Sequence, residues 1–536
     1  MPAVHAAVAQ ALAEYGVDVM FGLIGDANMF IAQSFVVEQK RRYVGAVHEA
    51  GAMFMAYGYA SVTGDLAVVT VTQGPALTNT ITGLVEGVRG RLPMLVIAGD
   101  TPVASRNHPQ DVDHRDFVLP TGAGYEQART PGSVLDDLAI AIRRAMLERR
   151  PVVLNIPSDF QFQEIAYRPV PLRLAAYQPL QPDSVAVAGA VDLLAGVRRP
   201  VLLAGRGAIP ARSELIRLAE RLGAPVTTTL KARDLFRGDP FDLGITGGLA
   251  TPVAVQTLAE ADCLLVFGAG LNDFTTGHGK LLEGKRIIHV EASPDHLGPY
   301  DAVVAGDPAA VARAILRRLD VRQIATSGFR SDQLAERIAA AAMDSTAVES
   351  VPGTVDAASA LRFLDAVLPT DRVVVSDGGR FMMTSLPLLR VAHPSAFVLP
   401  QNFGSIGTGM GAAIGAAYAE PRRPVVLVVG DGGFLHGGLA EFSTAVRERL
   451  DVIVVVCNDG GYGAEHIQFR DRALDPAISL FDWPDLADVA QALGGAAVTV
   501  RGLPDLAKAT VAIEQRERPL LIDLRLDVMV DTRIQH

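Results

Sequence analysis

The sequence contains very little cysteine, since Cys263 and Cys457 are the only two among 536 residues. Each lies inside an apolar run typical of a strand, which excludes a disulfide framework and a cysteine-ligated metal and predicts two buried packing residues. Positive charge is also scarce, with 48 Lys and Arg against 59 Asp and Glu. The net charge of −11 and the lack of a Lys/Arg cluster argue against binding of nucleic acid.

Long hydrophobic runs are missing as well. No apolar stretch approaches the roughly 20 residues that a membrane-spanning helix needs. The N-terminus lacks the basic start, apolar run and cleavage site of a signal peptide. These absences predict a soluble, cytoplasmic protein that does not bind membranes.

Short β-branched apolar runs alternate with helical segments along the chain, which predicts an α/β fold with buried parallel strands. The length exceeds what one core supports, and three domains of roughly 150 to 200 residues are expected. A Pro-rich stretch at 168–183 and a polar stretch at 322–357 are read as linkers. They bound predicted domains at 1–168, 184–322 and 356–536. The predicted strands are 17–23, 44–47, 66–71, 94–98, 151–156, 200–205, 263–268, 286–290, 372–376, 425–429, 452–457 and 519–524.

The stretch 425–463 ends two successive strands in polar turns. The first strand stops at Gly430-Asp431-Gly432-Gly433, and the second stops at Asn458-Asp459-Gly460-Gly461. Adjacent parallel strands bring such ends to the same edge of a sheet, where these folds bind ligands. Carboxylate oxygens beside glycine amides suit Mg²⁺ that holds a diphosphate. Gly-Asp-Gly by itself is typical of an ordinary turn, so this interpretation depends on its spacing from the Asn-Asp pair after the second strand.

Gly-Asp-Gly followed about 25 residues later by Asn, after a strand, resembles the thiamine diphosphate motif of the pyruvate decarboxylase and acetolactate synthase superfamily. The resemblance implies three doubly wound parallel-sheet domains: pyrimidine-binding, central and diphosphate-binding. It implies thiamine diphosphate and Mg²⁺ as cofactors and a small 2-oxo acid or other carbonyl compound as substrate. Because the family shares each site between subunits, it also implies a homodimer at least, and commonly a homotetramer.

The segment VHEAGAMFMAYGYASVTG resembles the family's activating-glutamate segment and singles out Glu49. In that role its carboxyl group, kept neutral in an apolar pocket, shares a proton with the pyrimidine ring of the cofactor. The alternative is a glutamate at a helix N-terminus that complements the helix dipole.

The segment QNFGSIGTGMGAAIGAA resembles the family's pyrimidine-binding segment. Ile406 matches the bulky residue over which the cofactor folds, and Gly404 matches the carbonyl that accepts from its amino group. A tightly packed Gly/Ala-rich helix is the plainer reading of the same residues. The resemblance further assigns diphosphate binding to Gly430, Asp431, Gly432, Gly433, Asp459, Tyr462 and Gly463.

The sequence leaves two possible sets of metal ligands. Counting from Asp431 selects Asn458, whereas alignment on the following Gly-Tyr-Gly-Ala-Glu selects Asp459 with the carbonyl of Gly461. One extra residue within 434–438 would reconcile the two counts. Asp459 is therefore favoured, and an aspartate also ligates Mg²⁺ well.

Three further residues resemble those of the decarboxylase branch, and Gln73 stands where the family more usually has Ser. Asp26, His114 and Glu465 match a set that protonates the reacting carbon and releases an aldehyde, and Gln73 is expected to face the same cavity. Each of the three has a plainer reading, as a turn residue, a loop histidine and a helix-start carboxylate. Only one histidine of the family's His-His pair is present, and members that ligate can also carry a histidine here.

The central domain resembles the flavin-binding domain of acetolactate synthases only in part. Gly270 and Phe274, in FGAGLNDF, stand where flavin-binding members have arginines, so no FAD is expected. The glycine-rich turn at 204–207 lacks a full GxGxxG and is a weak nucleotide signal.

The predicted function is non-oxidative, thiamine diphosphate- and Mg²⁺-dependent decarboxylation of a 2-oxo acid, with aldehyde release or carboligation. One alternative is an acetolactate synthase-like carboligase. A second is a catalytically inactive paralogue that keeps the fold, which intact Glu49, Ile406 and Asp431 disfavour.

Overall fold

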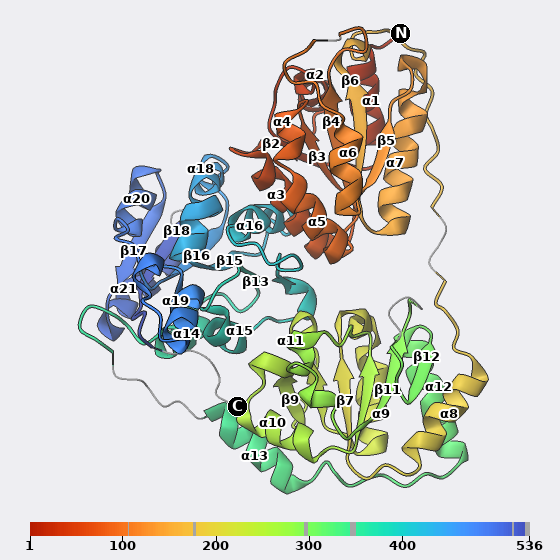
Figure 1. The fold of residues 1–536 in the computed structure, drawn as a ribbon, viewed down its shortest axis with the longest axis vertical. Helices are drawn as coiled ribbons and strands as arrows, with labels where there is room; N and C mark the ends of the chain where they lie inside the picture. Colours follow the sequence, from red (N-terminus) through yellow and green to blue (C-terminus); the bar gives the residue numbers. More distant parts are fainter. Residues whose placement is uncertain (106, 175–177, 294–297, 344–349, 517–518, 531–536) are drawn as a thin grey trace. The chain divides into compact units, whose positions relative to one another are not determined.

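The computed structural model describes residues 1–105, 107–174, 178–293, 298–343, 350–516 and 519–530. The chain forms two compact units. The first is built from Met1–Ala175, Val348–Ser385 and Ser395–Asp531, and the second from Ala176–Ala347, Leu386–Pro394 and Thr532–His536. Three six-stranded sheets with flanking helices make up the fold, as Figure 1 shows. The α/β prediction is therefore confirmed, whereas the domain boundaries stay a prediction.

The first sheet is parallel and has the strand order β2-β1-β3-β4-β6-β5. Its residues alternate between two cores: Phe21 and Val69 face one side, whereas Met20 and Val68 face the other. Its strands are β1 (Val19–Gly22), β2 (Arg42–Gly45), β3 (Ala67–Val71), β4 (Met94–Asp100), β5 (Gly124–Gln127) and β6 (Pro151–Pro157). Its helices are α1 (Val4–Glu14), α2 (Met29–Val37), α3 (Glu49–Thr63), α4 (Pro75–Thr78), α5 (Ile81–Gly90), α6 (His114–Val118) and α7 (Val134–Glu148).

The sheet of the C-terminal part has the order β14-β13-β15-β16-β18-β17, again parallel. Its strands are β13 (Val373–Ser376), β14 (Phe397–Val398), β15 (Val425–Gly430), β16 (Val452–Asn458), β17 (Ala496–Val500) and β18 (Leu520–Arg525). Its helices are α14 (Ala357–Val367), α16 (Gly409–Ala419), α17 (Asp431–Gly433), α18 (Leu439–Arg447), α19 (Gly463–Asp471), α20 (Leu486–Ala492) and α21 (Leu506–Gln515), and α15 (Met382–Leu388) follows β13. The chain winds both ways from β13, so the candidate residues after β15 and β16 meet at one edge.

Two helices join these two sheets within the first unit. Helix α3 packs on α16 through glycines that leave no room for a side chain. A Cβ on Gly58 would lie 2.0 Å from the carbonyl oxygen of Ala412, and one on Gly415 would lie 1.8 Å from that of Met55. The Gly/Ala richness of 404–417 therefore serves close helix packing, as its plainer reading predicts.

The second unit holds the third parallel sheet, with the order β12-β11-β10-β7-β8-β9. Its strands are β7 (Pro200–Ala204), β8 (Val226–Thr228), β9 (Asp242–Ile245), β10 (Cys263–Phe267), β11 (Arg286–Glu291) and β12 (Ala302–Ala305). Its helices are α8 (Ser184–Leu194), α9 (Arg212–Leu222), α10 (Pro252–Glu260), α11 (Asp273–Thr276), α12 (Pro308–Val321) and α13 (Asp332–Met343). Cys263 in β10 and Cys457 in β16 are both buried and free, as predicted.

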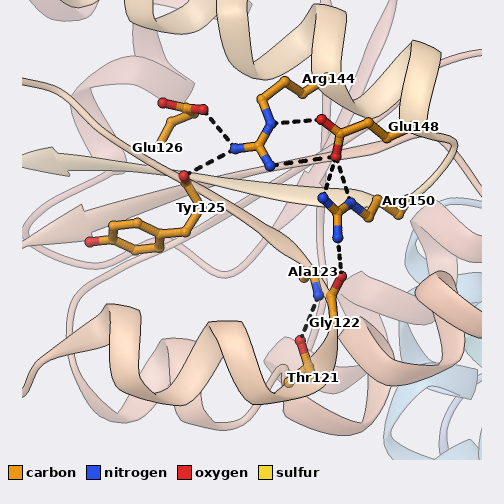
Figure 2. A network of polar contacts seen from close by, with 8 residues as sticks. All are labelled: Thr121, Gly122, Ala123, Tyr125, Glu126, Arg144, Glu148 and Arg150. Atoms are coloured by element: carbon orange, nitrogen blue, oxygen red, sulfur yellow. Dashed lines mark hydrogen bonds and ion pairs between the residues drawn. The ribbon is translucent and has the colours of Figure 1, made fainter.

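An ion-pair network fixes the edge strand β5, which pairs only with β6. Arg144 on α7 donates to Glu126 of β5 at 2.7 Å and to Glu148 at 2.9 Å, as Figure 2 shows. Glu148 in turn accepts from Arg150, whose guanidinium also donates to the carbonyl of Gly122. These contacts hold the last turn of α7 against the edge of the sheet.

The predicted strand at 44–47 is wrong by two residues, because β2 covers Arg42–Gly45. The chain leaves the sheet there since the backbone N–H of Val47 donates to Glu441 on α18 rather than to a strand. No helix in the described part of the chain is long and apolar enough to cross a membrane.

Candidate active site

The two polar turns predicted from the sequence meet at the edge of the C-terminal sheet. Strands β15 and β16 pair in register up to Gly430 and Cys457, so Asp431 and the residues after Cys457 leave the sheet side by side. Asp431 is 1 % exposed, and its carboxylate accepts a hydrogen bond from the backbone N–H of Gly461 at 2.9 Å. Burial and then the nearby Asp459 carboxylate raise the pKa of Asp431 to about 7. A buried acidic pair of this kind is suited to a divalent cation.

The side chains of Asn458 and Asp459 point to different neighbours. Asn458 donates from Nδ2 to Asp523 of β18 at 2.9 Å, and its Oδ1 accepts from the N–H of Gly460. Asp459 instead lies close enough to Asp431 to raise its pKa, and it pairs with Arg380 at 2.7 Å. The amide of Asn458 therefore faces the next strand, whereas the carboxylate of Asp459 belongs to the acidic pair.

A π-helical turn covers Phe434–Gly438, between α17 and α18. Such a turn closes its hydrogen bonds over five residues instead of four and so takes up one more residue than an α-helical turn. One extra residue in this same segment is what reconciles the two possible sets of metal ligands in favour of Asp459. The turn thus supports the alignment that selects Asp459.

Small residues and aromatic rings shape the space around the acidic pair. A Cβ on Gly432 would lie 2.6 Å from the ring of Tyr462, and one on Gly463 would lie 2.3 Å from the carboxylate of Asp459. Tyr462 packs edge-on against Phe481, which stacks on Trp483. The indole N–H of Trp483 lies beside Asp431 and partly offsets the rise in the pKa of that carboxyl group. Two carboxylates with an N–H donor beside them fit a cation that carries an anionic group.

The loop with Gly404 and Ile406 is fixed at its far end by Asp377, which the sequence analysis did not single out. Asp377 is 1 % exposed at the end of β13, and it accepts from the N–H groups of Gly378 at 2.6 Å and of Gly409 at 3.1 Å. Burial raises the pKa of Asp377 to about 6 despite these bonds. Asp377 could have been predicted from the sequence, because Asp377-Gly378-Gly379 follows a strand in the same way as Asp431-Gly432-Gly433. Gly404 has a φ of 86°, a conformation that favours glycine.

Glu49 is the first residue of helix α3 and directly follows His48. The preceding residue His48 caps the helix by accepting from the N–H of Ala50 at 3.1 Å. Glu49 is 8 % exposed, and Asn79 donates to its Oε2 at 2.9 Å. The placement accommodates both readings of this residue, since a carboxylate here complements the helix dipole and is also largely withdrawn from water.

Both ring nitrogens of His114 form hydrogen bonds, one with the turn at Gly74 and one with Asn155 in β6. Its Nε2 accepts from the N–H of Gly74 at 2.9 Å, and its Nδ1 lies 2.7 Å from the Oδ1 of Asn155. Because Gly74 donates to Nε2, the ring carries its proton on Nδ1. Gln73, the residue before this turn, is buried and donates to Gln110 at 2.9 Å. His114 thus orients the segment that carries Gln73.

Asp26 and Glu465 are exposed, unlike the other predicted acids. The turn around Asp26 rests against β3, because the N–H of Ala27 donates to Thr72 at 3.1 Å. Glu465 lies in the first turn of α19. The candidates therefore form two groups, each at the carboxyl edge of its sheet: Asp26, Glu49, Gln73 and His114 in the N-terminal part, and the remaining ones in the C-terminal part.

The backbone N–H groups of the glycine-rich turn in the second unit donate hydrogen bonds to carbonyl groups of the protein. The N–H of Gly205 donates to Phe267 at 2.8 Å, and that of Gly207 donates to Gly268 at 3.1 Å. Phe274 is 44 % exposed, and no atom lies within 4 Å of a Cβ built on Gly270. These are the two positions at which flavin-binding relatives are expected to carry arginines.

Comparison with known families matches all three parts of the chain. Residues 3–117 match the N-terminal TPP binding domain of thiamine pyrophosphate enzymes, residues 187–315 the central domain, and residues 377–524 the C-terminal TPP binding domain. Each match falls on one of the three sheets, although the first ends before β5 and β6 and the last begins after β13. Both groups of candidate residues lie inside the matched spans.

Curated relatives extend over nearly the whole chain. A probable 2-ketoarginine decarboxylase of Pseudomonas aeruginosa is 31% identical, over 97% of this chain and 93% of its own length. The acetolactate synthase large subunit of Parasynechococcus marenigrum is 30% identical, over 97% and 87%. A sulfoacetaldehyde acetyltransferase of Rhodobacter capsulatus is also 30% identical, over 94% and 90%. Relatives with nearly the same sequence identity to this chain are thus named for three different activities.

Proposed function

The chain belongs to the thiamine pyrophosphate enzyme family, and from this premise we propose a thiamine diphosphate- and Mg²⁺-dependent enzyme that cleaves or forms a carbon–carbon bond beside the carbonyl of a 2-oxo acid. The observation that carries the proposal is the pair of Asp431, which is buried, and Asp459, whose side chain is 10 % exposed, at the edge of a parallel sheet. We infer that this pair holds the metal that binds the diphosphate.

The metal site would consist of Asp431, Asp459 and the carbonyl of Gly461. Two carboxylates and a carbonyl are oxygen ligands of the kind that Mg²⁺ prefers. The π-helical turn and the bond from Asn458 to Asp523 support Asp459 over Asn458. The amides of 430–433 are donors that would face the diphosphate oxygens.

Bound thiamine diphosphate would supply the carbon nucleophile and the electron sink that loss of CO₂ from a 2-oxo acid requires. Glu49, which is 8 % exposed, would hold a proton against the pyrimidine nitrogen of the cofactor. Asn79 fixes the orientation of this carboxyl group through its 2.9 Å bond. Ile406 and the carbonyl of Gly404 would orient the pyrimidine ring.

Release of an aldehyde is the outcome that we favour for the decarboxylated substrate. Asp26 and Glu465 are exposed acids that can exchange protons with solvent, whereas His114 orients the turn beside Gln73. The match to a 2-ketoarginine decarboxylase supports this outcome. Carboligation is the second candidate, and the matches to acetolactate synthase and sulfoacetaldehyde acetyltransferase support it. An inactive paralogue is disfavoured because Glu49 and Asp431 are both present and buried.

The working enzyme is proposed to be a cytoplasmic homodimer or homotetramer, with a flavin-free central domain. The loss of arginines at Gly270 and Phe274 and the internal use of the Gly205 and Gly207 amides support the lack of FAD. The domain boundaries proposed are those of the sequence analysis, at 1–168, 184–322 and 356–536.

The test is product analysis with thiamine diphosphate and Mg²⁺, using pyruvate and branched, aromatic and guanidino 2-oxo acids in turn. Release of CO₂ with an aldehyde supports the decarboxylase, and formation of an acetohydroxy acid supports the carboligase. A protein that binds both cofactors but consumes none of these substrates, alone or with a second carbonyl compound, would refute the proposal.

A further inference from the structure

Glu86 on helix α5 is a buried carboxylate that the proposed mechanism does not use. Its side chain is 1 % exposed, and within the part of the chain that the structure describes its hydrogen-bond donors come from two residues of a distant segment. The N–H of Asn402 donates to Oε1 at 2.8 Å, and the side-chain amide of Asn402 donates to the same oxygen. The N–H of Phe403 donates to Oε2 at 2.7 Å. One carboxylate thus holds three N–H groups of a loop that lies more than 300 residues away in the sequence.

Neighbouring residues hold the same segment from the N-terminal part of the chain. The hydroxyl of Tyr57 on α3 donates to the carbonyl of Leu399 at 3.0 Å and accepts from the amide of Asn402 at 2.8 Å. The guanidinium of Arg89, one turn beyond Glu86, lies 4.7 Å from the ring centre of Phe403. We call residues 399–403 the clamped segment.

The clamped segment leads directly into Gly404 and Ile406, the proposed contacts of the pyrimidine ring. Beyond them, Asp377 fixes the chain by accepting from the N–H of Gly409. The loop of 404–408 is therefore anchored at both ends, by Glu86 on one side and by Asp377 on the other. Gln401, within the clamped segment, also donates to the carbonyl of Ser405 at 2.6 Å, so the clamped segment is tied directly to this loop.

We propose that Glu86 is a positioning residue for the pyrimidine half of the cofactor, an inference that rests on the proposed function. A carboxylate suits this role because it only accepts, and here it faces three donors. In Glu86→Gln one oxygen becomes an NH₂ donor that faces another N–H, which leaves buried donors without acceptors. The clamped segment then shifts, and Gly404 and Ile406 move with it.

The expected result separates the two halves of the cofactor. Glu86→Gln should weaken binding of thiamine diphosphate with Mg²⁺ by about 10-fold to 100-fold, the range expected when a buried hydrogen-bonding group loses its partner. Binding of inorganic diphosphate with Mg²⁺ should stay unchanged, because Asp431 and Asp459 do not contact the clamped segment. Both affinities are measured on the full-length protein by titration calorimetry or by the fluorescence of Trp483, the single tryptophan.

Two further variants complete the test. Tyr57→Phe removes one hydroxyl from the clamp, keeps the ring, and should give the same selective loss to a smaller extent. Glu148→Gln alters a carboxylate of the same part of the chain that accepts from Arg144 and Arg150 instead, and it should change neither affinity.

Three outcomes would overturn the inference. If the wild type binds thiamine diphosphate and neither Glu86→Gln nor Tyr57→Phe weakens it, Glu86 does not position the ring. If a variant loses thiamine diphosphate and inorganic diphosphate to the same extent, the role of Glu86 is general stability. A wild type that binds no thiamine diphosphate would instead refute the proposed function, and the inference with it.

Discussion

Arg380 provides the sharpest test of how this site balances its charge. Its guanidinium pairs with Asp459 at 2.7 Å, with side-chain exposures of 7 % and 10 %. The same group donates to the carbonyls of Val528 at 2.7 Å and Val530 at 3.2 Å, which fix it in place. Asp431 stands next to this ion pair and has a pKa raised mainly by burial. Arg380 is thus the counter-ion in a nearly buried acidic site.

Replacing Arg380 by Gln should strongly destabilise the metal-free protein. Removing one partner of a buried ion pair costs about 3 to 5 kcal/mol, because an uncompensated charge stays behind. The pair keeps a little solvent contact, so the lower end, about 3 kcal/mol, applies here. This corresponds to a roughly 100-fold shift of the unfolding equilibrium toward the unfolded state.

Urea denaturation followed by Trp483 fluorescence measures this loss. Trp483 is the only tryptophan and stacks on Phe481 beside the acidic pair, so it reports on this part of the chain. The metal-free wild type, Arg380→Gln, Asp459→Asn and the double variant form a cycle that isolates the pair's coupling. The double variant removes both charges and should recover most of the stability. Mg²⁺ should stabilise Arg380→Gln more than the wild type, because the cation replaces the missing charge.

Two results would refute this reasoning. If Arg380→Gln is as stable as the wild type, Arg380 does not compensate the acidic pair. If the double variant is as unstable as Arg380→Gln, the cost comes from the lost bonds to Val528 and Val530 and not from the unpaired carboxylate of Asp459.

Three further predictions follow from the same structure. Glu49→Gln should slow proton exchange at the reactive carbon of bound thiamine diphosphate by about 10² to 10⁴-fold without loss of the cofactor, and exchange at the wild-type rate would remove Glu49 from its role. Asp459→Ala should reduce Mg²⁺ affinity more than Asn458→Ala in equilibrium binding, and the reverse order would favour Asn458 as the ligand. Burial raises the pKa of Glu148, but hydrogen bonds from Arg144 and other partners outweigh it and hold the pKa below the ordinary 4.5. Its contribution of about 0.2 to 1 kcal/mol, small because the group is partly exposed, should therefore be full above pH 4.5 and disappear as the pH falls through the lowered pKa. Urea unfolding of Glu148→Gln and the wild type should differ at pH 7 and converge in acid, and a constant difference would contradict this.

The strands that could be predicted from the sequence are mostly those in the middle of each sheet. Strands such as β15 and β16 are buried on both faces, so their sequences are continuous apolar runs. Five of the strands that were missed, β5, β9, β12, β14 and β17, lie at sheet edges, and the sixth, β8, is three residues long. Edge strands are short or partly exposed, as β17 is along most of its length, and so carry no such run.

The site residues divide along a similar line. Asp431 and Asp459 were found because each follows its strand within one or two residues, so the motif is local. Arg380 and Glu86 were missed because their partners lie far away in the chain. Asn402, for example, is 316 residues from Glu86, and no spacing rule connects the two.

His114 shows why the role of a residue is harder to predict than its place. The sequence predicts that it helps to protonate the reacting carbon, and this role stays a prediction. Its Nε2 accepts from Gly74 while its Nδ1 donates to Asn155, whose amide in turn donates to Gln127 at 2.8 Å. Since Gly74 occupies Nε2 and Asn155 occupies Nδ1, His114 positions the turn that carries Gln73, and no motif in the sequence predicts these two contacts.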